Sequence, residues 1–303
     1  RFKCDWSSDV CSSDLKKLLP THQKIKIGMK IIDTHQHFWN YNPKTQEWIN
    51  ENMKVIRKNF LPEDIAPLLK ENKVEGCVTV QADQSIAETN FLIQAAKNNT
   101  FIKGVVGWID LKDKEIEQNI EFYKKENIVK GFRHIIQAEP IGFMQDLSFQ
   151  KGLTALAKYN YTYDLLIYEH QLNEANILVK QLPSLPIVID HIAKPNIKKG
   201  ERENWQKEIK AIAQNINVYC KISGMVTEAH WESWTAEILK PYIDTVVEAF
   251  GTERIMFGSD WPVCLVACSY ARWLECIQNY FNTFRTYEQE AFFANNAINF
   301  YKI

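Results

Sequence analysis

Two histidines separated by a single residue, His35 and His37, follow a short apolar run near the start of the sequence. Side chains alternate between the two faces of a β-strand, so both imidazoles would point the same way if this segment is extended. Two neutral imidazoles on one face form half of a divalent metal site, or a pair of proton carriers. Far along the chain, Asp260 ends a second apolar run that begins at Arg254. We therefore expect one site that is built from the two ends of the chain.

Eight short apolar runs alternate with amphipathic stretches from Met29 onward, and these runs are the candidate strands that would position such a site. They are rich in valine and isoleucine and mostly apolar on both faces, which is typical of buried parallel strands. A helical pattern with an apolar stripe follows each run, and the first of these helices begins at Pro62. The eight runs span residues 30–33, 76–81, 104–109, 129–134, 163–168, 187–191, 217–223 and 254–260.

Eight strand–helix units predict an α/β fold, namely a (β/α)8 TIM barrel formed by a single domain over residues 29–303. The competing architecture is a doubly wound sheet, which usually carries a glycine-rich phosphate loop after its first strand. Here the first strand runs into His-Gln-His-Phe-Trp instead. In a barrel of this kind the active site lies at the C-terminal ends of the strands.

The first 28 residues differ from the rest of the chain. Residues 1–15 contain Ser-Ser-Asp twice and two cysteines, without useful periodicity and without the apolar core of a signal peptide. We interpret residues 1–28 as a non-native or disordered leader, translated from adapter or vector sequence, and expect the native start at Met29. A natural disordered extension is the alternative interpretation.

The composition narrows the range of partners and compartments. The chain has 36 basic and 37 acidic residues and a net charge of −1, without the basic stripe that a nucleic-acid or membrane-surface partner would need. No apolar run approaches the roughly 18–20 residues of a membrane span. Five scattered cysteines beyond the leader, without a secretory signal, favour a cytoplasmic protein. The sequence does not indicate the oligomeric state.

Polar and aromatic side chains gather at the predicted strand ends. A fixed guanidinium such as that of Arg133 usually meets a carboxylate or a carbonyl at a barrel mouth. A lone histidine there is more often a hydrogen-bonded structural residue than a ligand, and Trp39 and Trp108 fit packing as well as a substrate wall. Asp33 either belongs to the site or braces the first turn. The strand-end residues are Asp33, His35, His37, Trp39, Gln81, Asp83, Trp108, Asp110, Arg133, His134, Tyr168, Glu169, His170, Asp190, His191, Lys194, Lys221, Ser223 and Asp260.

Two segments resemble the signatures of a known family. Asp-Thr-His-Gln-His-Phe-Trp at residues 33–39 and Gly-Ser-Asp-Trp-Pro-Val at residues 258–263 resemble those of the amidohydrolase-related family, a branch of the metal-dependent barrel hydrolases. Gly-Phe-Arg-His at 131–134, Ile-Asp-His-Ile-Ala-Lys-Pro at 189–195 and Cys-Lys-Ile-Ser-Gly at 220–224 agree as well. The resemblance covers residues 29–303, and it is nearest to the sugar-lactone hydrolases of this branch.

The resemblance implies which residues hold a metal. His35 and His37 correspond to the ligands of the first strand, and His191 corresponds to the histidine of the sixth. Asp260 corresponds to an acid of the eighth strand that is both ligand and general base. Two-metal members have a bridging lysine or glutamate on the fourth strand, where this chain has Arg133, and that difference speaks against a binuclear centre. One divalent ion, zinc, is implied, although members of the branch differ in whether they need a metal.

We expect a hydrolase of carbohydrate catabolism that opens a sugar lactone, an aldonolactone, to its hydroxy acid. Asp260 would act as the general base on water, and His35, His37 and His191 would be metal ligands or carbonyl polarisers. Arg133 and His191 would stabilise the developing oxyanion. The alternative is a metal-dependent decarboxylase with the same barrel. The expected substrate-binding residues are Trp39, Gln81, Asp83, Trp108, His134 and His170.

Overall fold

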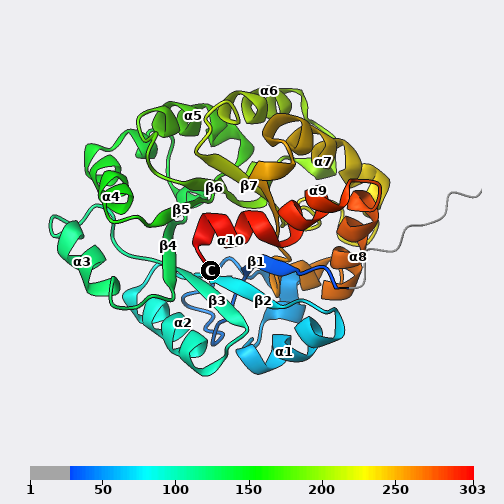
Figure 1. Cartoon of the computed structure of the whole chain (residues 1–303), viewed down its shortest axis with the longest axis horizontal. Helices are drawn as coiled ribbons and strands as arrows, with labels where there is room; N and C mark the ends of the chain where they lie inside the picture. Colours follow the sequence, from blue (N-terminus) through cyan, green and yellow to red (C-terminus); the bar gives the residue numbers. More distant parts are fainter. Residues whose placement is uncertain (1–27) are drawn as a thin grey trace, which may run out of the picture.

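Eight parallel strands form a ring at the centre of the molecule, and each pairs with the next along the chain (Figure 1). This computed structural model describes residues 28–303. The predicted (β/α)8 barrel in one domain is confirmed, and each of the eight predicted strands is present. The strands are β1 (Ile32–Gln36), β2 (Gly76–Val80), β3 (Ile102–Gly107), β4 (Val129–His134), β5 (Thr162–Leu165), β6 (Ile187–Ile189), β7 (Val218–Ile222) and β8 (Ile255–Phe257).

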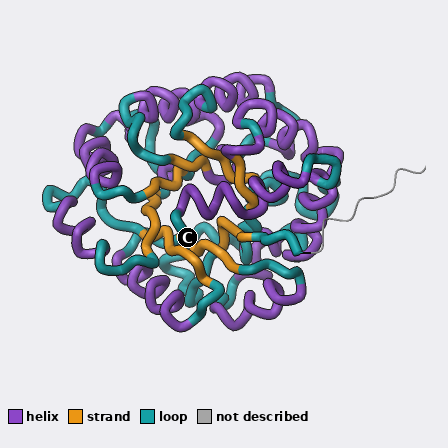
Figure 2. The backbone as a smooth tube through the Cα atoms, in the orientation of Figure 1, coloured by secondary structure: helices purple, strands orange, loops and turns teal. Residues whose placement is uncertain are grey.

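Eight helices, each following its strand along the chain, form the outer ring that covers the sheet (Figure 2). The predicted start of the first helix at Pro62 is correct, and Leu61 N donates to Asp64 Oδ2 at 2.8 Å to cap it. The apolar stripes of the helices pack on the outward faces of the strands and form the larger of two cores. The helices are α1 (Pro62–Glu71), α2 (Ile86–Asn98), α3 (Ile116–Tyr123), α4 (Leu147–Lys158), α5 (Leu172–Lys180), α6 (Glu203–Ile212), α7 (Ala236–Phe250) and α8 (Tyr270–Phe281).

The end of the chain closes one mouth of the barrel. After α9 (Thr286–Glu290) and a π-helical turn (Ala291–Asn295), α10 (Asn296–Tyr301) lies across the centre of the ring (Figures 1 and 2). Lys130, at the start of β4, donates to the Lys302 carbonyl at 3.1 Å, so this is the mouth at the N-terminal ends of the strands. The inner core comprises Ile32, Val78, Val80, Val106, Val188, Met256, Ala294, Ala297, Phe300 and Tyr301.

The first and last strands meet at the opposite mouth through main-chain hydrogen bonds. Asp260 N donates to His35 O, and His37 N donates to Trp261 O, both at 2.7 Å. The pairing of β1 shifts register between Asp33 and Gln36. Asp33 Oδ1 accepts from Ser259 N at 2.9 Å and from His35 N at 3.2 Å, so Asp33 braces this junction. These contacts place His35 and the residues after β8 side by side.

Strand ends differ from the prediction by a few residues. The first strand extends to Gln36 rather than Asp33, so that His35 lies within it, and the sixth ends at Ile189, before His191. The leader expected over residues 1–28 lies outside the described residues except for Gly28. Among the described helices, none combines the length and the apolar character that crossing a membrane requires.

Candidate active site

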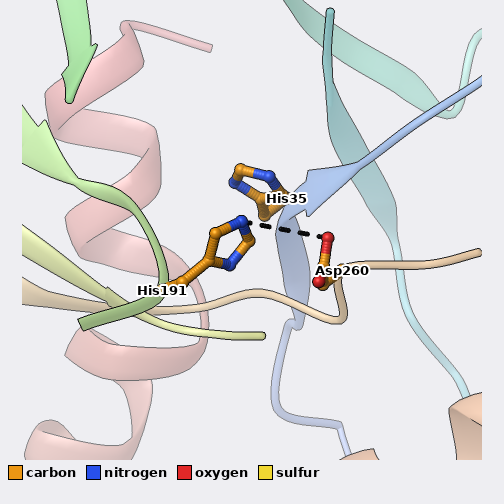
Figure 3. A group of neighbouring side chains, drawn as sticks. All are labelled: His35, His191 and Asp260. Atoms are coloured by element: carbon orange, nitrogen blue, oxygen red, sulfur yellow. Dashed lines mark ion pairs between the residues drawn. The ribbon is translucent and has the colours of Figure 1, made fainter. Parts of the chain in front are cut away.

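Three histidines from distant parts of the chain converge on Asp260. His37 Nε2 is 3.4 Å from Asp260 Oδ1. His191 Nε2 is 3.9 Å from the same oxygen, and Figure 3 shows this pair with His35 beside it. The ring of His35 packs against both other rings, with centroids 4.9 Å from that of His37 and 4.3 Å from that of His191. All four side chains are buried. The structure thus brings together the two ends of the chain, with a contribution from the segment that follows β6.

Contacts on the far side of each ring decide which nitrogen faces Asp260. His37 Nδ1 lies 2.7 Å from the Val80 carbonyl, which can only accept, so Nδ1 carries a proton. Nε2 then faces a carboxylate oxygen of Asp260 at 3.4 Å. A proton on Nε2 or a cation between the two atoms would satisfy the carboxylate. His191 Nδ1 is 2.9 Å from Ser223 Oγ, which can donate or accept.

Residues 191–194 form a left-handed turn. The backbone angle φ is 54° at His191, 49° at Ile192, 60° at Ala193 and 47° at Lys194. Such a backbone costs roughly 1–2 kcal/mol for each non-glycine residue, and a β-branched residue rarely adopts it. Lys194 N donates to His191 O at 2.8 Å, and Trp205 Nε1 donates to Ile192 O at 2.8 Å. The surrounding structure therefore holds this turn against its strain, as is typical of functional sites.

Gly224 leaves room for the ring of His191. Its φ is 61°, and a Cβ atom at this position would lie 2.6 Å from His191 Cγ and 3.0 Å from His191 Cβ. The preceding residue, Ser223, supplies the hydroxyl that contacts Nδ1 of the same ring. The end of β7 therefore fixes the orientation of His191 from two sides.

A buried layer of charges crosses the barrel interior beside His35. Asp190 accepts from Arg133 Nη1 at 2.9 Å and pairs with Lys221 Nζ at 3.1 Å and His35 Nδ1 at 3.2 Å. Lys221 also pairs with Asp164. Two cations and two anions make the layer neutral, and each charge has an opposite partner, which is what burial of ions requires. Arg133 Nη1 also lies 3.3 Å from His35 Nε2, so this nitrogen is the acceptor of the ring.

The site combines neutral imidazoles with ionised carboxylates. Burial lowers the pKa of His35 and of His191 well below 6.5. Burial acts to raise the pKa of Asp260, but the neighbouring imidazoles, that of His191 first, outweigh it, and the pKa lies below 3.8. For Asp190, the Lys221 ammonium and His35 likewise outweigh burial and hold the pKa well below its usual value. At neutral pH these are the protonation states of metal ligands.

The donor atoms fit a divalent cation. His35, His191 and Asp260 each offer one ligand atom, and these atoms lie within 4.8 Å of one another. His37 Nε2 adds a fourth potential donor beside the carboxylate. Imidazole nitrogen and carboxylate oxygen are the donors that zinc takes in catalytic sites.

A second group of potential ligands already surrounds a charged side chain. His35, Asp164 and Asp190 also lie close enough together to hold an ion. However, Lys221 Nζ lies 3.2 Å from His35 Nδ1 and 3.1 Å from Asp190 Oδ1, and it pairs with Asp164. The ammonium supplies the positive charge at this position, which is consistent with at most one metal ion.

A cavity of about 300 Å³ opens beside Asp260. Its polar wall contains ionised or ionisable groups from β1, β4, β6 and β8, and the remainder is largely apolar. The lining residues are His37, Trp48, Ala82, Gln84, Arg133, Ile135, Gln137, Ala138, Leu166, His191, Lys194, Thr227, Asp260 and Val263.

Three of the expected substrate-binding residues lie behind this wall. Trp39 stacks on His37 at 6.4 Å between ring centroids and donates from Nε1 to the Lys58 carbonyl at 2.9 Å. Gln81 donates to the Arg133 carbonyl at 3.1 Å, and its own carbonyl accepts from Arg133 Nη2. Trp108 is anchored by its backbone to Thr89. All three position neighbouring segments and do not line the cavity.

The other three expected substrate-binding residues do not line the cavity either. Asp83 follows Ala82, but it is its neighbours Ala82 and Gln84 that line the cavity. His134 pairs with Glu139 at 2.8 Å. His170 is exposed, stacks on Tyr168 and lines a different cavity, beside α6.

Several residues of the cavity wall escaped the sequence analysis as site residues. Lys194 appeared only among the strand-end residues. Trp48 lies in the long connection after β1, where no periodicity marks it. Gln84 lies in a bend beyond β2, and Gln137 lies in a 3-10 helix (Ile136–Ala138) beyond β4, so the alternation of a strand does not extend to either residue and no signal in the sequence selects them.

Comparison with known proteins agrees with this geometry. Residues 32–303 match the amidohydrolase family. The L-fucono-1,5-lactonase of Burkholderia multivorans is 34% identical over 255 residues, covering 80% of this chain and 86% of that protein. That of Burkholderia ambifaria is 32% identical over 279 residues, covering 90% and 95%.

Solved structures show the same relationship. A zinc-bound amidohydrolase from Burkholderia multivorans superposes with a TM-score of 0.88 at 31% identity, covering 90% of this chain and 99% of that one. A dihydroxybenzoic acid decarboxylase from Polaromonas has a TM-score of 0.64 at 13% identity, covering 91% of this chain and 97% of that one, which is a likeness of fold alone.

Proposed function

The chain belongs to the amidohydrolase family, and from this membership we propose that it hydrolyses a sugar lactone to the corresponding hydroxy acid. The observation that carries the proposal is the ionised Asp260, which lies beside three imidazoles and lines a cavity of about 300 Å³ together with two of them, His37 and His191. Such a cavity is large enough for a single sugar ring. The two lactonase relatives cover most of the chain, and L-fucono-1,5-lactone is therefore the first substrate to test.

In the proposed reaction, Asp260 takes a proton from a water molecule while the water oxygen bonds to the lactone carbonyl carbon. The bond from that carbon to the ring oxygen then breaks, and the ring oxygen receives the proton. The carboxylic acid so formed ionises to a carboxylate. The low pKa of Asp260 keeps the side chain ready to accept a proton at neutral pH.

Negative charge develops on the carbonyl oxygen during the attack, and two groups in the wall would stabilise it. If Ser223 donates its hydroxyl proton to His191 Nδ1, the opposite nitrogen carries a proton and donates to the oxyanion. A donor of this kind contributes about 2.7–4 kcal/mol to catalysis. Arg133 acts through its charge, because Nη1 and Nη2 already donate to Asp190 and to the Gln81 carbonyl.

We propose one zinc ion as the cofactor, held by His35, His37 and Asp260, with His191 beside them. When bound, such an ion polarises a carbonyl group and lowers the pKa of water. The hydrogen bond from His37 Nδ1 to the Val80 carbonyl directs Nε2 towards the ion, whereas His35 would exchange the contact of Nε2 with Arg133 Nη1 for it. Metal analysis of protein purified without chelators should find about one zinc per chain; a fully active protein without metal would contradict this assignment.

The proposal is tested with a pH-indicator assay, which also separates the two candidate reactions. Opening of an aldonolactone releases acid, whereas decarboxylation of an aromatic carboxylate consumes protons. We expect acid release from L-fucono-1,5-lactone and no turnover of aromatic carboxylates. Decarboxylation without lactone opening would overturn the proposal.

The role of the base is tested with Asp260→Asn, which should lower kcat by about 10²- to 10⁴-fold while the fold is retained. Asp83→Asn is the matched control, because Asp83 also follows a strand but does not line the cavity. An Asp260→Asn variant as active as this control would exclude Asp260 as the base.

We further propose that the reaction takes place in the cytoplasm. The five cysteines of the described residues are all free thiols, and four of them are buried. An absence of disulfides is usual for proteins in a reducing compartment.

A further inference from the structure

The left-handed turn after β6 brings a second side chain, Lys194, into the cavity together with His191. Within residues 28–303, Lys194 Nζ forms no hydrogen bond to a protein acceptor. Its nearest carboxylate oxygen is Glu228 Oε1, at 4.0 Å. The ring of Tyr168 lies 5.5 Å from the ammonium and covers one side of it. An ammonium has three strongly hydrated donors, so the donors of Lys194 are available to a ligand or to water.

The other cation of the cavity wall is bound differently. Arg133 Nη1 donates to Asp190, and Nη2 donates to the Gln81 carbonyl. The Arg133 side chain is 3% exposed, whereas that of Lys194 is 17% exposed. Arg133 is therefore held in place by the protein, and Lys194 is the cation that can reorient towards a bound molecule.

The proposed reaction changes the charge of its reactant. The lactone is neutral, whereas the hydroxy acid carries a carboxylate on the carbon that was attacked. This carbon must lie beside Asp260, which shares the cavity wall with Lys194. The new carboxylate therefore forms next to a carboxylate side chain and is repelled by it. A cation with free donors on the same wall offsets that repulsion.

We propose that Lys194 Nζ binds the carboxylate that ring opening produces, so that this part of the cavity is a carboxylate subsite. The inference rests on the proposed lactone hydrolysis. Glu228 is the resting partner of Lys194: its oxygen lies too far away for a direct hydrogen bond, so it balances the charge of the ammonium without saturating the donors. The turn of residues 191–194 would then position two side chains for the same reaction, because it brings both His191 and Lys194 to the cavity wall beside the reacting carbon.

The test compares a charged and an uncharged ligand of the same shape. The probes are L-fuconate, which is the hydroxy acid from L-fucono-1,5-lactone, and L-fuconamide, which is its neutral amide. Calorimetry with wild-type protein and with Lys194→Met measures both affinities without requiring turnover. We expect Lys194→Met to weaken L-fuconate binding about 10- to 100-fold, as for loss of a charge-assisted hydrogen bond. Binding of L-fuconamide should change less than about twofold, because it carries no charge for the ammonium to attract.

Two further variants control for charge and for folding. Lys194→Arg should restore most of the L-fuconate affinity. Lys199→Met, an exposed lysine on the same connection that does not line the cavity, should behave like the wild type. The subsite would be overturned if Lys194→Met weakened the binding of both probes equally, or weakened the binding of neither. It would also be overturned if the wild-type protein did not bind L-fuconate.

Activity measurements separate this inference from the function on which it rests. Wild-type protein that opens the lactone, with Lys194→Met indistinguishable in L-fuconate binding, would leave the function standing and remove the subsite. Wild-type protein that binds L-fuconate through Lys194 but does not open the lactone would remove the proposed function and leave the carboxylate subsite standing. In an active protein, Lys194→Met should also raise the inhibition constant for L-fuconate more than it raises KM for the neutral lactone.

Discussion

Replacing Gly224 with alanine tests whether the orientation of His191 depends on the missing side chain. The new Cβ would lie 2.6 Å from His191 Cγ, and an ordinary contact begins at 3.4 Å, so the ring must retreat by about 0.8 Å. That movement pulls Nδ1 away from Ser223 Oγ, now at 2.9 Å, and changes the distance from Nε2 to Asp260. A misplacement of about 1 Å in a catalytic site costs on the order of 100-fold in rate.

Gly200→Ala is the matched control for backbone strain. Gly200 has φ of 70°, close to the 61° of Gly224, but a Cβ there meets nothing within 4 Å. Both variants place alanine in the left-handed region, which lowers the free energy of unfolding by about 1–2 kcal/mol. Only Gly224→Ala adds the collision with His191, which costs a further amount of about 1–3 kcal/mol.

The assay is lactone opening measured beside urea denaturation for the wild type and both variants. Gly200→Ala should lose stability and keep its kcat/KM, whereas Gly224→Ala should lose about 100-fold in kcat/KM and more stability than the control. If the two variants match each other in activity, the ring of His191 tolerates a displaced position, and the argument for its fixed orientation is refuted.

Two other substitutions test the buried charges. Lys221→Met removes the ammonium that pairs with Asp164 and Asp190, and it should lower the free energy of unfolding by about 3–5 kcal/mol in urea denaturation. Adding Asp164→Asn to this variant should recover part of the lost stability. A Lys221→Met protein as stable as the wild type would contradict the pairing. Burial raises the pKa of Glu88 from 4.5 to about 7, so the folded chain holds a proton that the unfolded chain releases, and stability falls as the pH rises between these values. Glu88→Gln, which keeps an acceptor for Asp83 N, should therefore raise the melting temperature more at pH 8 than at pH 5, and an equal change at both pH values would argue against the raised pKa.

The barrel could be predicted from the sequence because its signals are local. Most strands begin in or contain a short apolar run that is buried, and each strand is followed by a helix with one apolar stripe. The pair His35 and His37 could be assigned to one face from spacing alone. What the spacing could not show is the register shift in β1, which depends on pairing with β2.

The turn of residues 191–194 could not be predicted. Of His-Ile-Ala-Lys, only the histidine is of a type found more often than average in left-handed backbone, and Ile192 disfavours it. The conformation depends on tertiary contacts, with Trp205 on the Ile192 carbonyl and with Gly224 beside the ring of His191. Local preference was therefore overridden by contacts from segments that lie more than ten residues away.

The residues that line the cavity differ in part from the substrate-binding residues that the sequence predicts. Beyond β2, Ala82 and Gln84 line the cavity, whereas the prediction chose Gln81 and Asp83. Within β4, Arg133 lines the cavity, so the side chain of His134, the next residue of the strand, points to the other face. The alternation rule that paired His35 with His37 applies equally here. Arg133 and His134 are adjacent in a strand, and both could not have faced the same cavity.

The four charges of the buried layer come from neighbouring strands of the barrel. Arg133 pairs with Asp164 in the register of β4 and β5, and Val188 of β6 pairs with Tyr219 of β7. Asp190 and Lys221 each lie two positions further along, so the four charges come from four consecutive strands. Each charge sits in or directly after an apolar run, where it would be costly alone. The ion pairs nevertheless skip a strand, because Arg133 of β4 pairs with Asp190 after β6 and Lys221 of β7 pairs with Asp164 of β5. The order of the strands therefore brings the four charges to consecutive strands but does not select their partners, since the neighbouring β5 and β6 both supply an aspartate.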